Sequence, residues 1–396
     1  MVNWNVVNKV RDLPVFSENA AYQTCLIEEK ADEMIRKGED VILATNNEIT
    51  EDTPTYIKDT VKQALDRGYT QYPLLLGVNE LREAIAEKLR REDVEADPEK
   101  EILTTLGAQE GIFLTIQSLV NFDDEVIMFK PDYFFNFHIQ YSGGRSVFIP
   151  LRKESDFRLD LDAVAERITS RTKMICLDSP SNPVGRVYTE EELKGLAELA
   201  KDHDLYILYD TANERLVWEG RRNLNLLSFP GMRERAVNTS SVSKCYGMGG
   251  WRVGYVVAEE DFIRNIAKLH LLINNGGPPT FVQWGAAALY RDLESKPLKD
   301  LLKACEKRRD IAYKRINEIP NITCHKPDGG GVLIPDISYY DKSSTRFAYR
   351  LLKEAKVAVA PGSGYNAEGH VRIGFTIPRI EEAIDRIEEW ISTKRL

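Results

Sequence analysis

Residues 240–255 read SSVSKCYGMGGWRVGY, and this stretch decides the fold. Lys244 stands among serines and glycines directly after RAVNTSS (235–241), an apolar run typical of a buried strand, and Arg252 follows eight residues later. Sheets of α/β proteins bind their ligands at the carboxyl ends of the strands. A lysine at such an end is partly desolvated, which makes its amine a nucleophile. The stretch therefore predicts a reactive lysine on an α/β sheet.

Short apolar runs and amphipathic segments alternate on the amino-terminal side of this stretch. The runs EVIMF (125–129), KMICLD (173–178) and LYILYD (205–210) suit buried strands. The segment 189–204 begins with a capping box at Thr189 and Glu192 and continues with leucines at helical spacing. Such alternation predicts an α/β fold in which a mostly parallel sheet lies between helices.

The pattern changes to α+β after about residue 294. A long helix is expected from about Lys296, strands at 331–337 and 370–375, and a helix at 345–356. We predict three parts: residues 1–50 form an N-terminal arm and part of a small domain, residues 51–293 a large ligand-binding domain, and residues 294–396 the rest of the small domain.

Composition excludes several classes of protein. The 396 residues are 43% hydrophobic and carry a net charge of −9, which argues against a nucleic-acid-binding protein. No apolar run approaches the roughly 20 residues of a membrane helix, and the N-terminus lacks the pattern of a signal peptide. The five cysteines form no CxxC pair and the histidines no ligand-spaced pair, so neither a disulfide framework nor a metal site is expected. We predict a cytoplasmic protein.

The residues around Lys244 suit a particular ligand. A lysine amine condenses with a carbonyl group to form a Schiff base. Ser241, Ser243 and Arg252 supply two hydroxyls and a guanidinium suited to a phosphate. A carbonyl compound that carries a phosphate and is tethered to lysine describes pyridoxal phosphate (PLP).

Other parts of a PLP site are present along the chain. Asp210, at the end of a predicted strand, would face the ring nitrogen. Gly107, Ala108 and Gln109 precede a helix whose first amides would hold the phosphate. Further candidates are Tyr133 for stacking on the ring, Asn182 for its hydroxyl and Arg372 for a substrate carboxylate.

The sequence resembles the class I/II aminotransferases, the aspartate aminotransferase-like enzymes of PLP fold type I. Residues 241–254 match that family's lysine motif S-V-S-K-x-x-G-M-x-G-W-R-V-G, and residues 69–89, 181–193 and 357–375 also match. The resemblance covers nearly the whole chain. It implies an aminotransferase that moves the amino group of an L-amino acid to a 2-oxo acid through a Lys244 Schiff base, and a homodimer with active sites at the subunit interface.

The resemblance also implies roles for individual residues. Lys244 would carry the cofactor and move the α-proton, while Asp210 would pair with the ring nitrogen and Arg372 would bind the α-carboxylate. Asn182 and Tyr133 would contact the ring, and the phosphate would be bound by Ala108, Gln109, Ser241 and Arg252. Tyr72 would contact the phosphate of the neighbouring subunit.

The chain departs from the family's pattern at three places. Asn213 replaces a tyrosine that donates to the cofactor's phenolic oxygen; an amide also donates there but does not ionise. Asn46, Asn47 and Glu48 lie in LATNNEITEDTP (43–54), where relatives have a glycine-rich stretch beside the substrate. Gly331 and Val332 stand where an aromatic residue is common. We therefore expect a polar substrate side chain, such as a guanidino or amino group facing Glu48.

Two alternatives stay open at the level of sequence. The departures at residue 213 and at 43–54 also suit a PLP-dependent lyase, an eliminating or replacing enzyme, or a cyclase or oxidase of a polar, arginine-like amino acid. A non-catalytic protein that senses an amino acid is a third reading, because a fold by itself does not define a function.

Overall fold

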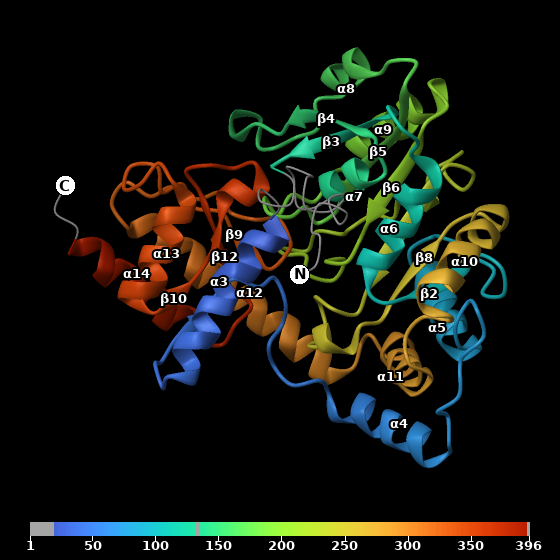
Figure 1. Cartoon of the computed structure of the whole chain (residues 1–396), viewed down its shortest axis with the longest axis horizontal. Helices are drawn as coiled ribbons and strands as arrows, with labels where there is room; N and C mark the ends of the chain where they lie inside the picture. The colour runs from blue at the N-terminus through green and yellow to red at the C-terminus, as the bar shows by residue number, and fades with distance from the viewer. Residues whose placement is uncertain (1–19, 132–134, 394–396) are drawn as a thin grey trace, which may run out of the picture.

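The structure is a computed structural model and describes residues 20–131 and 135–393. Its largest unit is a seven-stranded sheet in the order β2-β8-β7-β6-β5-β3-β4 (Figure 1). Only β8 runs against its neighbours, so the sheet is mostly parallel, as predicted. The strands are β2 (Ile102–Thr105), β3 (Glu125–Lys130), β4 (Arg145–Pro150), β5 (Thr172–Asp178), β6 (Tyr206–Asp210), β7 (Ala236–Ser241) and β8 (Gly254–Val257).

Both faces of this sheet are buried. Alternate residues of β3 and β5 belong to different apolar clusters. On one face of the sheet, Val126 and Met174 pack in a cluster with Ile112 of α6. On the other face, Ile127 and Ile175 pack in a cluster with Leu193 of α9. A strand buried on both faces consists of a nearly continuous apolar run, which explains the sequence of β3 and β5.

Helices cover the two faces. The described helices are α3 (Ala20–Arg36), α4 (Thr55–Asp66), α5 (Asn79–Arg90), α6 (Ala108–Leu119), α7 (Phe135–Tyr141), α8 (Leu161–Arg167), α9 (Glu190–Asp202), α10 (Glu260–Asn274), α11 (Thr280–Arg291), α12 (Lys296–Glu318), α13 (Ser344–Ala355) and α14 (Ile380–Ser392). The predicted capping box of α9 is present, since Glu192 N–H donates to Thr189 Oγ1 and Thr189 N–H donates to Glu192 Oε2.

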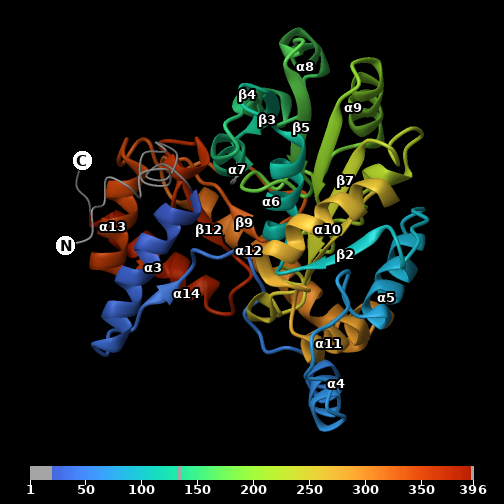
Figure 2. The same ribbon diagram turned by 45° about the vertical axis from the view of Figure 1, so that its right-hand side comes forward.

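The C-terminal segment forms two small sheets. β1 (Ile42–Leu43) pairs with β10 (Val357–Ala358), and β12 (Val371–Gly374) lies between β11 (Ala360–Pro361) and β9 (Val332–Leu333). Figure 2 shows α3 beside α13, and α3 also packs on β10 and β11, so a segment from the start of the described chain packs with its C-terminal part. The long helix α12 leads from the large sheet to this region (Figure 1).

The strand expected at 331–337 is shorter than predicted. Regular pairing covers only Val332–Leu333, and Asp336 makes isolated bridges to Thr323 and His370. Pro335 interrupts the run because proline has no N–H to donate to a ladder. The strand expected at 370–375 and the helix expected at 345–356 are present as β12 and α13.

Candidate active site

A cavity of about 140 Å³ opens at the carboxyl ends of β5, β6 and β7. Ten of the residues singled out from sequence line it, and Asn47 is one of them. The other nine form the rest of this set. They are Ala108, Gln109, Asn182, Asp210, Asn213, Ser241, Ser243, Lys244 and Arg252. These residues come from segments far apart in the chain, and the tertiary structure brings them together at one cavity.

Lys244 follows β7 and is half-buried beside the cavity. Its pKa is lowered, chiefly because burial penalises the ammonium; Arg372 and Arg252 lower it further, whereas Glu48 and Asp210 oppose them. A lowered pKa leaves more of the amine unprotonated and able to attack a carbonyl group. The environment therefore suits the predicted chemistry of this lysine.

Asp210, the last residue of β6, is buried and accepts a hydrogen bond from Thr239 Oγ1 at 3.1 Å. Burial raises its pKa to about 7, against the hydrogen bond and the Lys244 charge, which lower it. A buried carboxyl with a raised pKa becomes favourably ionised only when a cation faces it. A protonated pyridine ring in the cavity would be such a cation.

A second part of the cavity suits a phosphate. Helix α6 begins at Ala108, and its N-cap Gly107 makes no side-chain cap, so the first amides of the helix are left for an anion. Arg252 Nη1 lies 3.3 Å from Ser243 Oγ and 3.0 Å from the Gly249 carbonyl oxygen. Gly107 itself does not line the cavity; a Cβ there would lie 2.5 Å from Arg252 Nη2, so this glycine makes room for the guanidinium.

Arg372, on β12, is buried next to the cavity rather than in its wall. Its Nη1 donates to Asn182 Oδ1 at 3.2 Å, its Nη2 donates to the Thr45 carbonyl oxygen, and its guanidinium lies 4.7 Å from the centre of the Tyr365 ring. Its Nε is buried without a partner in the described chain. The guanidinium is thus held in place with donor capacity still unused.

The segment 45–48 lies against this group of residues. Asn47 Nδ2 donates to Asn213 Oδ1 at 3.0 Å. Asn46 and Glu48 are half-buried and do not line the cavity, although the Glu48 charge reaches Lys244. The Glu48 carboxylate packs against Gly249, where a Cβ would lie 1.9 Å from Oε2.

Among the described residues, Tyr72 lies apart from the cavity. Tyr72 is 81% exposed and lines a separate surface hollow with residues 274–281. Tyr133 lies outside the described residues.

Sequence reasoning missed two wall residues, Asp178 and Ala212. Asp178 Oδ2 accepts the Asn182 N–H at 2.7 Å and so shapes the turn that carries Asn182. Its position as the last residue of a predicted strand, like that of Asp210, was the signal that could have found it.

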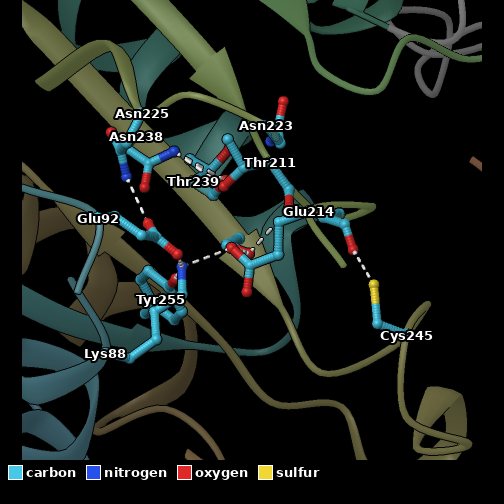
Figure 3. A network of polar contacts seen from close by, with 12 residues as sticks. Lys88, Glu92, Thr211, Glu214, Asn223, Asn225, Asn238, Thr239, Cys245 and Tyr255 are labelled. Atoms are coloured by element: carbon cyan, nitrogen blue, oxygen red, sulfur yellow. Dashed lines mark hydrogen bonds and ion pairs between the residues drawn. The ribbon is translucent and has the colours of Figure 1, made fainter. Parts of the chain in front are cut away.

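A buried polar network joins α5 to β8 and to the segment after β6 (Figure 3). Lys88 Nζ on α5 is 2.6 Å from Glu214 Oε2, 2.8 Å from Glu92 Oε1 and 3.0 Å from Tyr255 Oη. The pKa of Lys88 is raised because these carboxylates outweigh its burial. Glu214 also accepts hydrogen bonds from Ser240 and Tyr246, which flank the segment that carries Lys244.

The described residues contain no cluster of three metal-ligating side chains, and none of their helices combines the length and apolarity needed to cross a membrane.

Comparisons with known proteins agree with this geometry. The family model "Aminotransferase class I and II" matches residues 39–387. The chain is 35% identical to an aromatic-amino-acid aminotransferase of Thermococcus litoralis, over 87% of this chain and 90% of the relative, and 35% identical to an aspartate aminotransferase of Pyrococcus abyssi, over 90% and 93%.

Solved structures give the same result. An aromatic aminotransferase from Pyrococcus horikoshii superposes with a TM-score of 0.85 at 34% identity, covering 91% of this chain and 98% of the other. An aspartate aminotransferase from Thermus thermophilus with maleate superposes with a TM-score of 0.87 at 31% identity, covering 92% and 96%. The matched motifs, the mostly parallel sheet and these likenesses together make the chain a member of the class I and II aminotransferases, PLP-dependent enzymes of fold type I.

Proposed function

We propose that the cavity at the carboxyl ends of β5, β6 and β7 is the PLP site and that Lys244 is the catalytic residue. The convergence of Lys244, Asp210 and Arg252 on one cavity carries this proposal. When bound, PLP supplies the aldehyde that takes up the amino group and a ring that stabilises negative charge at the substrate's α-carbon. Lys244 Nζ removes and returns the α-proton, a role that its lowered pKa favours.

The other wall residues orient the cofactor. Asp210 keeps the ring nitrogen protonated, because an ionised carboxylate in a buried site favours a cation beside it. The first amides of α6 at Ala108 and Gln109, the hydroxyls of Ser241 and Ser243, and Arg252 hold the phosphate. Asn182 and Asn213 face the ring's phenolic oxygen. The resemblance to the family assigns the stacking on the ring to Tyr133, which lies outside the described residues.

Arg372 binds the substrate's α-carboxylate. Asn182, Thr45 and Tyr365 fix its guanidinium, and its unpaired Nε shows unused capacity for hydrogen bonds. A planar guanidinium held from several sides is suited to bidentate recognition of a carboxylate.

The substrate's side chain is polar, and a cationic group suits it best. The Glu48 carboxylate is half-buried against Gly249 with its charge close enough to act on Lys244, and Asn46 and Asn47 add polar groups beside it. This substrate class differs from those in the names of the relatives, which are aspartate and aromatic aminotransferases.

A product screen tests both the reaction and the substrate class. Purified enzyme is mixed with arginine, ornithine, lysine, aspartate or phenylalanine, with and without 2-oxoglutarate. We expect loss of the visible absorbance of bound PLP without the oxo acid, and formation of the donor's oxo acid, with the cationic amino acids preferred. Ammonia release with return of the absorbance would instead favour the lyase or oxidase alternative, and preference for aspartate would reject the role of Glu48.

The assembly is a homodimer in which the partner subunit's Tyr72 reaches the phosphate. The exposure of Tyr72 at a surface hollow supports this proposal. The division into parts 1–50, 51–293 and 294–396 is proposed with it, because β1 pairs with β10 and the large sheet ends before α12. We also propose that the enzyme works in the cytoplasm, since all five cysteines are free thiols.

A further inference from the structure

Asn47 and Asn213 belong to two separate departures from the family's pattern, and their side chains touch. Asn47 Nδ2 donates to Asn213 Oδ1 at 3.0 Å across 166 residues of sequence. Both side chains line the cavity, with 3% and 6% of their surface exposed. A hydrogen bond between two buried amides holds both side chains in defined orientations.

The contacts of Asn213 fix which way its amide faces. Its Nδ2 donates to the Pro180 carbonyl oxygen at 3.5 Å, while its Oδ1 accepts from Asn47. A flipped Asn213 amide would place its oxygen against the Pro180 oxygen and its nitrogen against the Asn47 nitrogen, pairing like with like. The observed orientation leaves the second N–H of Asn213 unused by either contact.

The third departure makes room for this arrangement. A Cβ on Gly331 would lie 2.5 Å from Asn47 Oδ1 and 2.8 Å from Thr376 Cγ2, so a larger residue there would displace Asn47. Asn47 Oδ1 is buried without a partner in the described chain, which is unfavourable. The Asn47 side chain therefore acts through its nitrogen, which donates its hydrogen bond to Asn213.

We propose that Asn47 is a positioning residue that holds the Asn213 amide with an N–H directed into the cavity, where it donates to the phenolic oxygen of PLP. Residues 47, 213 and 331 then form one unit that takes over the hydrogen bond of the family's tyrosine. The inference rests on the cofactor role proposed above for Asn213.

The pH midpoint of the visible absorbance of the PLP-loaded protein tests the proposal. Leucine is close to asparagine in size but donates no hydrogen bond. We expect Asn213→Leu to raise the midpoint by about one pH unit, because a lost donor leaves the phenolic oxygen with a higher affinity for protons. Asn47→Leu should give a similar rise, and the double variant no more than the larger single effect.

Two further variants sharpen the test. Gly331→Ala keeps both asparagines but crowds Asn47, so the midpoint should move in the same direction. Asn225→Leu alters a buried asparagine that does not line the cavity, and it should leave the midpoint unchanged. Circular dichroism and equilibrium dialysis of PLP identify variants that have lost their fold or their cofactor.

The outcomes separate the inference from the proposed function. If Asn213→Leu shifts the midpoint and neither Asn47→Leu nor Gly331→Ala does, or if the single shifts add, Asn47 does not act through Asn213. If Asn213→Leu binds PLP with an unchanged midpoint, the role of Asn213 fails and this inference with it, whereas the roles of Lys244 and Asp210 stand. Failure of the unmodified protein to bind PLP overturns both.

Discussion

At the scale of single residues, the Asp210 carboxyl is buried, and burial raises its pKa to about 7. In the cofactor-free protein the folded state holds this proton up to about pH 7, whereas the unfolded chain releases it near the ordinary carboxyl pKa of 3.8. The contribution of Asp210 to stability is therefore full below about pH 4 and is lost as the pH rises to 7.

Asp210→Asn should remove this pH-dependent loss of folding stability, since an amide does not ionise. We expect the cofactor-free variant to be more stable than the unmodified protein at pH 8, by up to about 4 kcal/mol, and the difference to shrink at pH 5. Urea unfolding at the two pH values measures it. A difference that does not change with pH would show that Asp210 is not the group that titrates. The same variant should bind PLP more weakly, because the ring nitrogen loses its counterion.

At the scale of elements, the Lys88–Glu214 ion pair joins α5 to the loop after β6 (Figure 3). Both side chains are almost fully buried, and Glu92 is a second carboxylate on Lys88. Removing one partner of a buried pair leaves an uncompensated charge, so Lys88→Met should lower the free energy of unfolding by about 3–5 kcal/mol. Thermal and urea unfolding provide the measurement.

The double variant Lys88→Met/Glu214→Gln is the matched control for that experiment. It also removes the charge of Glu214, so it should be more stable than Lys88→Met alone. Full additivity of the two losses would contradict the pairing.

Close packing of β8 on the start of α6 gives a second prediction at this scale. A Cβ on Gly254 would lie 2.4 Å from the Gly107 carbonyl carbon and 2.6 Å from the Ala108 nitrogen, both of them backbone atoms. Gly254→Ala must therefore push the first turn of α6 away from β8. We expect PLP affinity to fall at least tenfold in equilibrium dialysis, since this turn holds the phosphate. Unchanged affinity would place the phosphate elsewhere.

At the scale of the whole molecule, two exposed leucines lie close in sequence to residues that line the hollow of Tyr72. Leu74 is 62% exposed, and Leu272, near the end of α10, is 84% exposed. Interfaces between proteins bury exposed apolar side chains, and we place the interface of the proposed dimer at these two leucines. In the proposed dimer, Leu272→Glu should shift the protein to a monomer in sedimentation and reduce PLP affinity, because each site would lose the contact proposed for the partner subunit's Tyr72.

Phe122→Glu serves as the control for the assembly, because Phe122 is 85% exposed but lies outside the hollow that Tyr72 lines. It should leave the sedimentation unchanged. A Leu272→Glu variant that remains a dimer with normal PLP affinity would reject the proposed interface.

The sequence by itself determined the fold class, the strands β3, β5, β6 and β7, and most of the cavity wall. These features follow from local chemistry: apolar runs form buried strands, a capping box begins α9, and the motif around Lys244 is continuous. The length of β9 was predicted less well, because the missing N–H of Pro335 outweighs the apolar pattern around it.

Only the tertiary structure decided which distant residues meet. Residues more than 100 positions apart meet in the contact between Asn47 and Asn213 and in the Lys88–Glu214 pair. Gly331, also distant in sequence, leaves the space that Asn47 occupies. The tertiary structure also separated Arg372 and Glu48 from the cavity wall. Side-chain contacts between distant segments depend on how sheets and helices pack, and the local pattern of residues does not encode that packing.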